Sequence, residues 1–279
     1  MITLRVMTFN IRGSHHRDGA NAWKRRASLS ARVIQRCAPD LIGFQEFQAG
    51  NSRFYEAHLP EYERALGPEY ENRPPRSHNA IFWNPQRLEL LSTGGFWLSK
   101  TPEVFSGSWG THQKRSANWA RFRTARNGTE FVHLNTHLDH KSVAARRQGA
   151  RLLVRRIDEL AEGKLPALVT GDFNADPDSA VYRIFTGAGF EDAHRLAGET
   201  PARTFHKFQG EGFVSRRPEK EGRIDWVLVR GAGSELQPRK TSCRVVRDAE
   251  PPVYPSDHYP VFADLELEST AAPGHLTQI

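Results

Sequence analysis

Six short polar stretches contain the residues of this sequence whose types and spacing could carry out chemistry. They combine carboxylates, amides and imidazoles, and most of them sit at the end of an apolar segment typical of a buried strand. Proteins commonly place catalytic groups in loops at strand ends, because the sheet beneath holds them in position. The stretches are Thr8-Phe9-Asn10-Ile11, Gln45-Glu46, Asn135-Thr136-His137-Leu138-Asp139-His140, Gly171-Asp172-Phe173-Asn174, Arg223-Ile224-Asp225-Trp226 and Ser256-Asp257-His258.

The side chains of these stretches suit a hard divalent cation and phosphate-ester chemistry. Glu46, Asp257 and Asn10 offer oxygen ligands of the kind that Mg²⁺ takes, and Mn²⁺ accepts the same ligands. No stretch contains cysteine, which argues against a structural zinc site. Phosphate-ester cleavage needs a divalent ion, positive hydrogen-bond donors and a carboxylate that handles water. The imidazoles and the other carboxylates of the same stretches could supply these groups.

Each stretch also has an ordinary structural interpretation when it is taken singly. Asp172 lies in a Gly-Asp-x-Asn pattern that commonly forms a turn stabilised by the Asp side chain. Glu46 could be only a carboxylate at a strand end, and His258 only a hydrogen-bonded, partly buried histidine. The joint occurrence of all the stretches favours a shared function.

Together the stretches resemble the endonuclease/exonuclease/phosphatase superfamily, which includes exonuclease III, DNase I, inositol polyphosphate 5-phosphatases, neutral sphingomyelinases and nocturnin-like deadenylases. They follow the family's order and extend from Asn10 to His258, over nearly the whole chain. Gly95-Phe96-Trp97-Leu98-Ser99-Lys100-Thr101-Pro102 and Trp119-Ala120-Arg121-Phe122 resemble small bacterial members near the nocturnin branch. The resemblance implies an α/β fold of the α+β type: a four-layer α/β sandwich of two packed mixed β-sheets flanked by helices, with the site at one edge.

The resemblance also implies roles for the residues of the site. Glu46 is expected to be the principal metal ligand, with Asn10 and Asp257 completing or neighbouring the ion, which is Mg²⁺ or alternatively Mn²⁺. Asp172 is expected to orient or deprotonate the attacking water, or to protonate the leaving oxygen. Asn174 is expected to hold the phosphate and Asp172 in place.

Two histidines complete the expected catalytic set. His258, oriented by Asp225, is expected to contact a non-bridging phosphate oxygen, and His137 to stabilise the transition state from another side. An aspartate partner favours the imidazolium form, which is a positive hydrogen-bond donor. Four further residues are possible substrate contacts, although the two arginines among them could equally form surface ion pairs: His78, Asn79, Arg115 and Arg121. Asp139 is expected to brace the His137 loop rather than to touch substrate.

Apolar patterning predicts the elements that must position these residues. Helices are predicted from Trp23 to Cys37, from Ser142 to Ala161 and after Asp176-Pro177-Asp178-Ser179, where proline and acidic residues suit a helix start. Many strands with few helices and no strict βαβ alternation favour mixed sheets covered by helices. The predicted strands are Leu4–Ile11, Leu41–Gln45, Ala80–Trp83, Leu88–Leu98, Trp119–Thr124, Glu130–Thr136, Ala167–Thr170, Ile224–Val229 and Tyr259–Leu265.

Length and charge limit the remaining possibilities. The 279 residues are compatible with one domain, expected over residues 1–268 with a frayed tail at 269–279. Lys and Arg outnumber Asp and Glu by 39 to 32, and the resulting net charge of +7 favours an anionic partner, although it could equally reflect solubility alone. Cys37 and Cys243 are interpreted as free thiols, with a single disulfide between them as the alternative. No apolar run approaches the roughly 20 residues of a membrane helix, and a cytoplasmic location is expected. A monomer is expected as well.

Three functions remain open. The leading hypothesis is a phosphodiesterase or nuclease that hydrolyses nucleic acid, and the alternative is a phosphatase that acts on a small sugar, inositol or nucleotide phosphate. The basic balance weakly favours the first, but the sequence lacks the aromatic residues interleaved with Lys and Arg that stack single-stranded bases. A non-catalytic binding module is the third, and it is disfavoured because all six stretches are intact.

Overall fold

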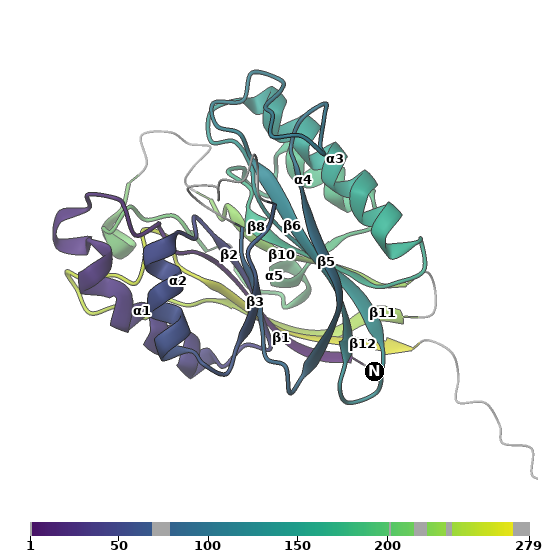
Figure 1. Ribbon diagram of the computed structural model, residues 1–279, viewed down its shortest axis with the longest axis horizontal. Coiled ribbons are helices and arrows are strands. Elements are labelled where there is room, and N and C mark those ends of the chain that lie inside the picture. Colours follow the sequence, from purple (N-terminus) through teal and green to yellow (C-terminus); the bar gives the residue numbers. More distant parts are fainter. Residues whose placement is uncertain (1, 69–78, 201, 215–221, 233–235, 270–279) are drawn as a thin grey trace, which may run out of the picture.

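Two six-stranded mixed sheets pack face to face, and helices cover their outer faces (Figure 1). The computed structural model describes residues 2–68, 79–200, 202–214, 222–232 and 236–269. The expected four-layer α/β sandwich is confirmed. The first sheet has the order β11-β12-β1-β2-β4-β3, with β1 (Ile2–Asn10), β2 (Leu41–Gln45), β3 (Glu63–Ala65), β4 (Ile81–Trp83), β11 (Leu236–Val245) and β12 (Val261–Ser269). The second has the order β5-β6-β7-β8-β10-β9, with β5 (Leu88–Trp97), β6 (Ser116–Thr124), β7 (Glu130–His137), β8 (Ala167–Asp172), β9 (Glu191–Asp192) and β10 (Asp225–Arg230).

Helices lie on both outer faces of the sandwich. In Figure 1, α1 and α2 lie on one side of the molecule and α3 and α4 on the other. The described helices are α1 (Trp23–Cys37), α2 (Ala49–His58), α3 (Val143–Ala161), α4 (Ala180–Gly187) and α5 (Ala193–Leu196), with short 3₁₀ turns η1 (Gly19–Asn21) and η2 (Gly210–Gly212). None of these helices is long and apolar enough to cross a membrane.

The helix ends follow local sequence signals. α1 has the predicted bounds, and it ends where Ala38 adopts a left-handed conformation just before Pro39. α3 begins after Ser142, whose hydroxyl accepts a hydrogen bond from the backbone N–H of Ala145 at 3.1 Å. Ser179 caps α4 in the same way, through the backbone N–H of Tyr182 at 3.2 Å.

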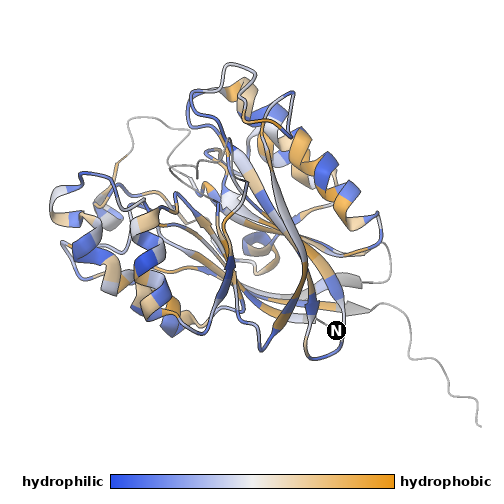
Figure 2. Ribbon diagram, in the orientation of Figure 1, coloured by the Kyte–Doolittle hydropathy of each residue, from blue (hydrophilic) through white to orange (hydrophobic). Residues whose placement is uncertain are grey.

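Side chains of β1 alternate between the two apolar layers that the sheet separates. Leu4 and Val6 pack between the sheets, whereas Met7 and Phe9 pack against α1 and α2. Successive side chains of a strand point to opposite faces, so a sheet covered on both sides needs apolar residues at nearly every position. Figure 2 shows this as hydrophobic strands in the interior and helices on which hydrophobic and hydrophilic segments alternate.

The layer between the sheets becomes polar toward one edge of the sandwich. Gln45 Nε2 donates to Thr8 Oγ1 at 3.1 Å and to Asn135 Oδ1 at 2.8 Å, and His133 Nε2 lies 2.8 Å from Thr170 Oγ1. Burial lowers the pKa of His133 to about 3, so this imidazole is neutral. These polar side chains lie on the same faces of their strands as the apolar side chains between the sheets. They occupy positions two to four residues nearer the strand ends. The network therefore links the apolar centre to the residues at the edge.

The elements differ from the sequence-based prediction in a few places. The helices α2 and α5 and the strands β3, β9 and β11 were not predicted, and Ser269 belongs to β12 rather than to a tail. Residues 270–279 lie outside the described residues. Cys37 and Cys243 are both buried free thiols, as expected.

Candidate active site

The polar stretches meet because strand ends of both sheets lie at one edge of the sandwich. β1 and β2 are parallel and their last residues pair, which puts Asn10 beside the turn that carries Glu46. β7 and β8 are also parallel, with His137 opposite Asp172. β10 runs antiparallel to β8, so its first residue, Asp225, is opposite Asp172 as well. Strand pairing thus gathers two of the expected site residues in the first sheet and three in the second, and packing of the sheets brings the two groups together, with Asn10 Nδ2 3.0 Å from Asp172 Oδ2.

The segment before β12 returns to the same edge, because β12 is antiparallel to β1. Ser256 connects the two, since its hydroxyl donates to the backbone oxygen of Asn10 at 2.6 Å and accepts from the backbone N–H of His258 at 3.3 Å. The same hydroxyl lies 3.3 Å from Asp257 Oδ1. One buried serine therefore fixes Asp257 and His258 relative to Asn10.

Asp172 lies at the centre of the group and is 2% exposed. Its Oδ2 lies 3.0 Å from Asn10 Nδ2 and 3.1 Å from His137 Nε2, and its Oδ1 accepts from the backbone N–H of Asn174 at 3.0 Å. Burial opposes ionisation, but the positive charges of His137 and His258 and the Asn10 hydrogen bond together hold the pKa of Asp172 below its ordinary value. Asp172 is consequently a carboxylate at neutral pH.

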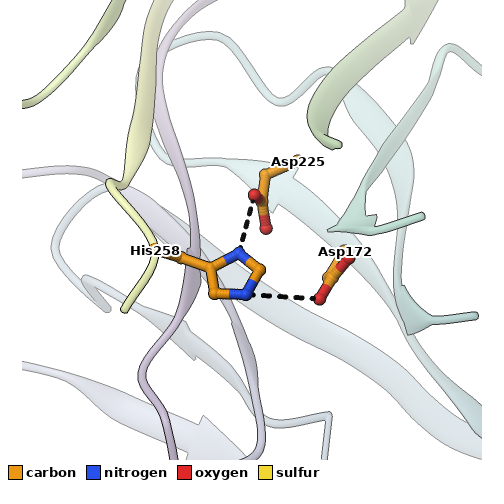
Figure 3. A group of neighbouring side chains, drawn as sticks. All are labelled: Asp172, Asp225 and His258. Atoms are coloured by element: carbon orange, nitrogen blue, oxygen red, sulfur yellow. Dashed lines mark hydrogen bonds and ion pairs between the residues drawn. The ribbon is translucent and has the colours of Figure 1, made fainter. Parts of the chain in front are cut away.

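His258 is held between two aspartates, as Figure 3 shows. Its Nδ1 lies 2.9 Å from Asp225 Oδ2, and its Nε2 lies 3.8 Å from Asp172 Oδ2. Burial acts to lower the pKa of His258, but the charges of Asp225, Asp172 and Asp257 outweigh it and raise the pKa to about 10. The imidazole is therefore a cation at neutral pH and can donate a hydrogen bond to an anion.

Glu46 occupies a backbone conformation that points its side chain into the site. Its φ of 59° lies in the left-handed region, which costs a non-glycine residue on the order of 1 kcal/mol. Its carboxylate lies 3.3 Å from Asn10 Nδ2 and 3.2 Å from His16 Nε2. Burial opposes ionisation, yet the His16 hydrogen bond and the positive charges of His137 and Arg12 keep the pKa of Glu46 below its usual range. Glu46 is thus a charged, partly accessible carboxylate that could serve as an oxygen ligand.

Asn174 holds the turn after β8 rather than pointing only into the cavity. Its φ is 48°, its backbone N–H donates to Asp172, and its Nδ2 donates to the backbone oxygen of Leu138 at 3.1 Å. It therefore ties Asp172 to the loop that follows His137. The expected contact of Asn174 with phosphate stays a prediction. Asn174 also lines the cavity described below.

Two groups of side chains could hold a metal ion. Asp172, Asp225 and His258 present ligand atoms within 4.8 Å of one another. In this group, however, the imidazole already contacts carboxylates through both nitrogens. The second group is Glu46 and Asp257, which both line the cavity, with Asn10, whose Nδ2 lies 3.3 Å from the Glu46 carboxylate; oxygen ligands of this kind suit Mg²⁺ or Mn²⁺.

The site opens into a cavity of about 810 Å³. Its floor contains Glu46, Asp172 and His258, and its walls come from loops of both sheets. The wall residues that sequence reasoning did not assign to the site include one polar side chain, two cations and three aromatic rings: Gln48, Arg12, Lys114, Trp97, Phe105 and Phe205. Arg12 lies one residue beyond the stretch that ends at Ile11, and Gln48 lies two beyond the stretch that ends at Glu46, so this proximity could have indicated them. Phe105 and Lys114 carry no such signal.

Asn79 and Arg115, two of the four possible substrate contacts, line this cavity. Asn79 Nδ2 donates to the backbone oxygen of Ser116 at 2.6 Å, which limits its capacity to bind anything else. Arg115 is half-buried, and its Nε is buried without a hydrogen-bond partner among the described residues. Burial lowers the pKa of Arg115, but a guanidinium remains charged at neutral pH.

Of the other two possible contacts, Arg121 is not brought to the site. Arg121 points away along β6, where it forms ion pairs with Glu130 at 2.8 Å and Glu162 at 3.2 Å, and it does not line the cavity. The surface ion pair was the alternative interpretation for this residue, and its position supports that alternative. His78 lies outside the described residues.

Asp139 braces the cavity wall, because its carboxylate accepts five hydrogen bonds. Oδ2 accepts from Thr111 Oγ1 at 2.9 Å and from the backbone N–H groups of His112 and Gln113 at 2.8 and 3.1 Å. Oδ1 accepts from the backbone N–H groups of residues 141 and 142, at the start of α3. The carboxylate thereby joins the loop that leads to Arg115 to the loop that follows His137.

We expect Asp139→Asn to destabilise the protein by on the order of 2–3 kcal/mol, because an amide turns an NH₂ group toward backbone donors. Substrate KM should rise as well, since the loop before Arg115 loses its anchor. Urea unfolding and steady-state kinetics measure the two effects. The exposed Asp178→Asn is the control, and it should change the free energy of unfolding by less than about 0.5 kcal/mol. Equal stability of the two variants would contradict the bracing role.

Comparison with known proteins identifies similar sequences and folds. Residues 7–258 match the profile of the Endonuclease/Exonuclease/phosphatase family. Among solved structures, a family protein from Bacteroides vulgatus is 31% identical, with a TM-score of 0.84 and coverage of 96% of this chain and 100% of the other. A mannosyl-6-phosphatase from Bacteroides thetaiotaomicron is also 31% identical, with a TM-score of 0.82 and coverage of 94% and 99%.

Nocturnin from Drosophila melanogaster is a more distant relative by sequence. It is 28% identical over 207 residues, which make up 66% of this chain but only 30% of the fly protein. This chain thus spans less than a third of the length of that relative.

Proposed function

Since the chain belongs to the Endonuclease/Exonuclease/phosphatase family, we propose that this phosphoesterase is a Mg²⁺-dependent phosphatase that hydrolyses a small phosphomonoester of the sugar-phosphate class. The reaction adds water to phosphorus and breaks the bond to the leaving oxygen, giving an alcohol and inorganic phosphate.

Glu46, Asn10 and Asp257 would hold the divalent ion. Glu46 carries a charge at neutral pH and is accessible from the cavity, as a metal ligand must be. When bound, the ion withdraws charge from the phosphoryl group and stabilises developing negative charge on oxygen. Asp172 and His258 are then left to act directly on water and phosphate, with Asp225 orienting His258, which agrees with their ion pairs.

Asp172 would hold the attacking water. As a buried carboxylate facing His137 and Asn10, it can accept a hydrogen bond from water and take the proton that water loses on attack. The His258 cation, oriented by Asp225, would donate to a non-bridging phosphate oxygen, and His137 would donate from another side. Such preorganised donors act where negative charge develops in the transition state.

The observation that carries the choice of a monoester is the Arg115 guanidinium in the cavity wall. Within the described part of the chain, no carboxylate lies within ion-pair distance of it. A half-buried guanidinium without a direct ion-pair partner has lost part of its hydration, and a bound anion would offset this cost. A phosphomonoester carries close to two negative charges at neutral pH, because its second pKa is about 6, whereas a diester carries one.

Two further observations support a small substrate. The cavity of about 810 Å³ falls within the range of roughly 300–1,000 Å³ that is usual for small-molecule sites. In addition, the mannosyl-6-phosphatase of Bacteroides thetaiotaomicron is 31% identical to this chain over nearly the full length of both.

We expect Arg115→Met to lower kcat/KM for a phosphomonoester by about 100-fold, because the phosphate loses a charged donor. The matched control is Arg121→Met, which removes the same charge from β6 outside the cavity and should change kcat/KM less than about 2-fold. Initial rates of phosphate release provide the measurement. Similar kinetics for the two variants would remove Arg115 from the phosphate site.

A nuclease is the second candidate, favoured by the net charge of +7. One panel separates the two: hexose, inositol and nucleotide monophosphates, a generic phosphodiester, single-stranded RNA, and single- and double-stranded DNA, each with Mg²⁺ or Mn²⁺. Phosphate release from the small monoesters with intact polymers supports the phosphatase. Metal-dependent shortening of a polymer, without turnover of monoesters, would establish the nuclease instead.

A further inference from the structure

Arg26 is a completely buried arginine that bonds only to backbone oxygens in the described structure. It lies in the first turns of α1 and is 0% exposed. Its Nη1 donates to the backbone oxygens of Ile11 at 2.7 Å and Pro255 at 2.9 Å, and its Nε donates to that of Asn21 at 2.9 Å. Its Nη2 bonds to the backbone oxygen of Arg12. Four carbonyl groups from three separate segments therefore converge on one guanidinium.

This arrangement is a costly way to stabilise a fold. No carboxylate of the described residues forms an ion pair with Arg26, although the rings of Trp23 and Phe208 lie 5.0 and 5.8 Å from its guanidinium carbon. Burial lowers the pKa of Arg26 to about 10, so the side chain still carries its charge at neutral pH. Burying a cation without a counter-ion is unfavourable, and apolar residues could fill the same space. The geometry that the arginine imposes on its partners is a better explanation for its presence.

The partners of Arg26 adjoin two expected metal ligands. Ile11 and Arg12 directly follow Asn10, and the backbone N–H of Arg12 donates to Asn10 Oδ1 at 3.0 Å. Pro255 is two residues before Asp257, and between them Ser256 bonds to the backbone oxygen of Asn10. The fixed fork of a guanidinium can hold both chain segments at a set separation, which the single ammonium of a lysine cannot do.

We propose that Arg26 is a positioning residue for the metal centre: its guanidinium joins the segment after Asn10 to the segment before Asp257 and thereby sets the spacing of these two ligands. The inference rests on the proposed function, because it takes Asn10, Glu46 and Asp257 as the ligands. Groups that orient metal ligands in this way typically contribute about 10–100-fold to metal affinity.

The test is direct Mn²⁺ binding to metal-stripped protein, measured by the electron paramagnetic resonance signal of free Mn²⁺. Arg26→Lys keeps the charge but not the fork, and Arg26→Gln removes both. We expect both to weaken Mn²⁺ binding by about 10–100-fold. Arg32→Lys and Arg32→Gln are the matched controls, since Arg32 lies on the same helix but is exposed and pairs with Glu250. The Mn²⁺ dissociation constants of both Arg32 variants should lie within about 2-fold of the wild-type value.

Thermal unfolding of the same proteins separates positioning from plain stability. If the Arg26 variants melt at a lower temperature yet bind Mn²⁺ as tightly as wild type below the transition, Arg26 is only structural and the inference is wrong. If wild-type protein itself binds no Mn²⁺, the proposed metal centre fails and the inference fails with it. Weak binding by both Arg26 variants, with normal binding by both Arg32 variants, supports the inference.

Discussion

Asp172→Asn is expected to lower kcat by about 10²–10³-fold while the protein keeps its fold. The asparagine has the size of the aspartate, so the packing around this buried position is preserved. It cannot take a proton from water, and its NH₂ group would face Asn10 Nδ2 or His137 Nε2, which the carboxylate now contacts. Steady-state rates of phosphate release, with circular dichroism as the check on folding, measure the effect.

The same variant distinguishes the two possible metal sites. If Glu46, Asn10 and Asp257 hold the ion, Glu46→Gln should weaken Mn²⁺ binding by at least about 10-fold, and Asp172→Asn, which contacts only the ligand Asn10, should weaken it less. If Asp172, Asp225 and His258 hold the ion, Asp172→Asn should lose the affinity and Glu46→Gln should keep it. An Asp172→Asn enzyme with nearly full turnover would contradict the catalytic role itself.

His258→Ala is the second variant with a large expected effect, a loss of about 10²–10³-fold in kcat. It removes the buried cation that would donate to the phosphate. Asp225→Asn should cause a smaller loss, because the imidazole remains but loses the carboxylate at 2.9 Å that orients and charges it. Rates for both variants against wild type test this order. A larger loss in Asp225→Asn than in His258→Ala would contradict the proposed division of roles.

The pH dependence of wild type should carry the signature of His258. Its pKa is raised from 6.5 to about 10, so the imidazolium is present throughout the neutral range and is lost only as the pH rises through the raised value. Activity that depends on this cation should therefore persist at pH 8 and decline under strongly alkaline conditions. In Asp225→Asn the decline should begin at lower pH, because the main stabilising charge is gone.

Periodicity predicted the long elements well and the edges of the sheets poorly. α1 has the predicted bounds because apolar residues recur at helical spacing and Pro39 follows its end. α2 was missed because it is weakly amphipathic and is capped by Gln48 and Asn51 rather than by serine and glutamate. β11 contains Pro238 and few apolar residues, which an edge strand tolerates because one side has no neighbour.

The site was predictable where strand ends carry the chemistry and unpredictable where a loop or a helix does. Asn10, His137, Asp172 and Asp225 lie at the ends of apolar strands, which the pattern indicates directly. Which of these residues meet depends on the order of strands in two sheets, and spacing along the chain does not encode that order. Arg26 was not singled out, because an arginine in an amphipathic helix ordinarily lies on the solvated face.

The most direct test of the central claim is phosphate release from a hexose 6-phosphate by wild type and Asp172→Asn, each with Mg²⁺ and with excess chelator. We expect turnover by wild type in Mg²⁺, none above background in chelator, and a loss of about 10²–10³-fold in the variant. Equal release by wild type with and without metal, or by wild type and variant, would contradict the account. So would a wild-type enzyme that leaves every small monoester intact while it shortens nucleic acid in Mg²⁺.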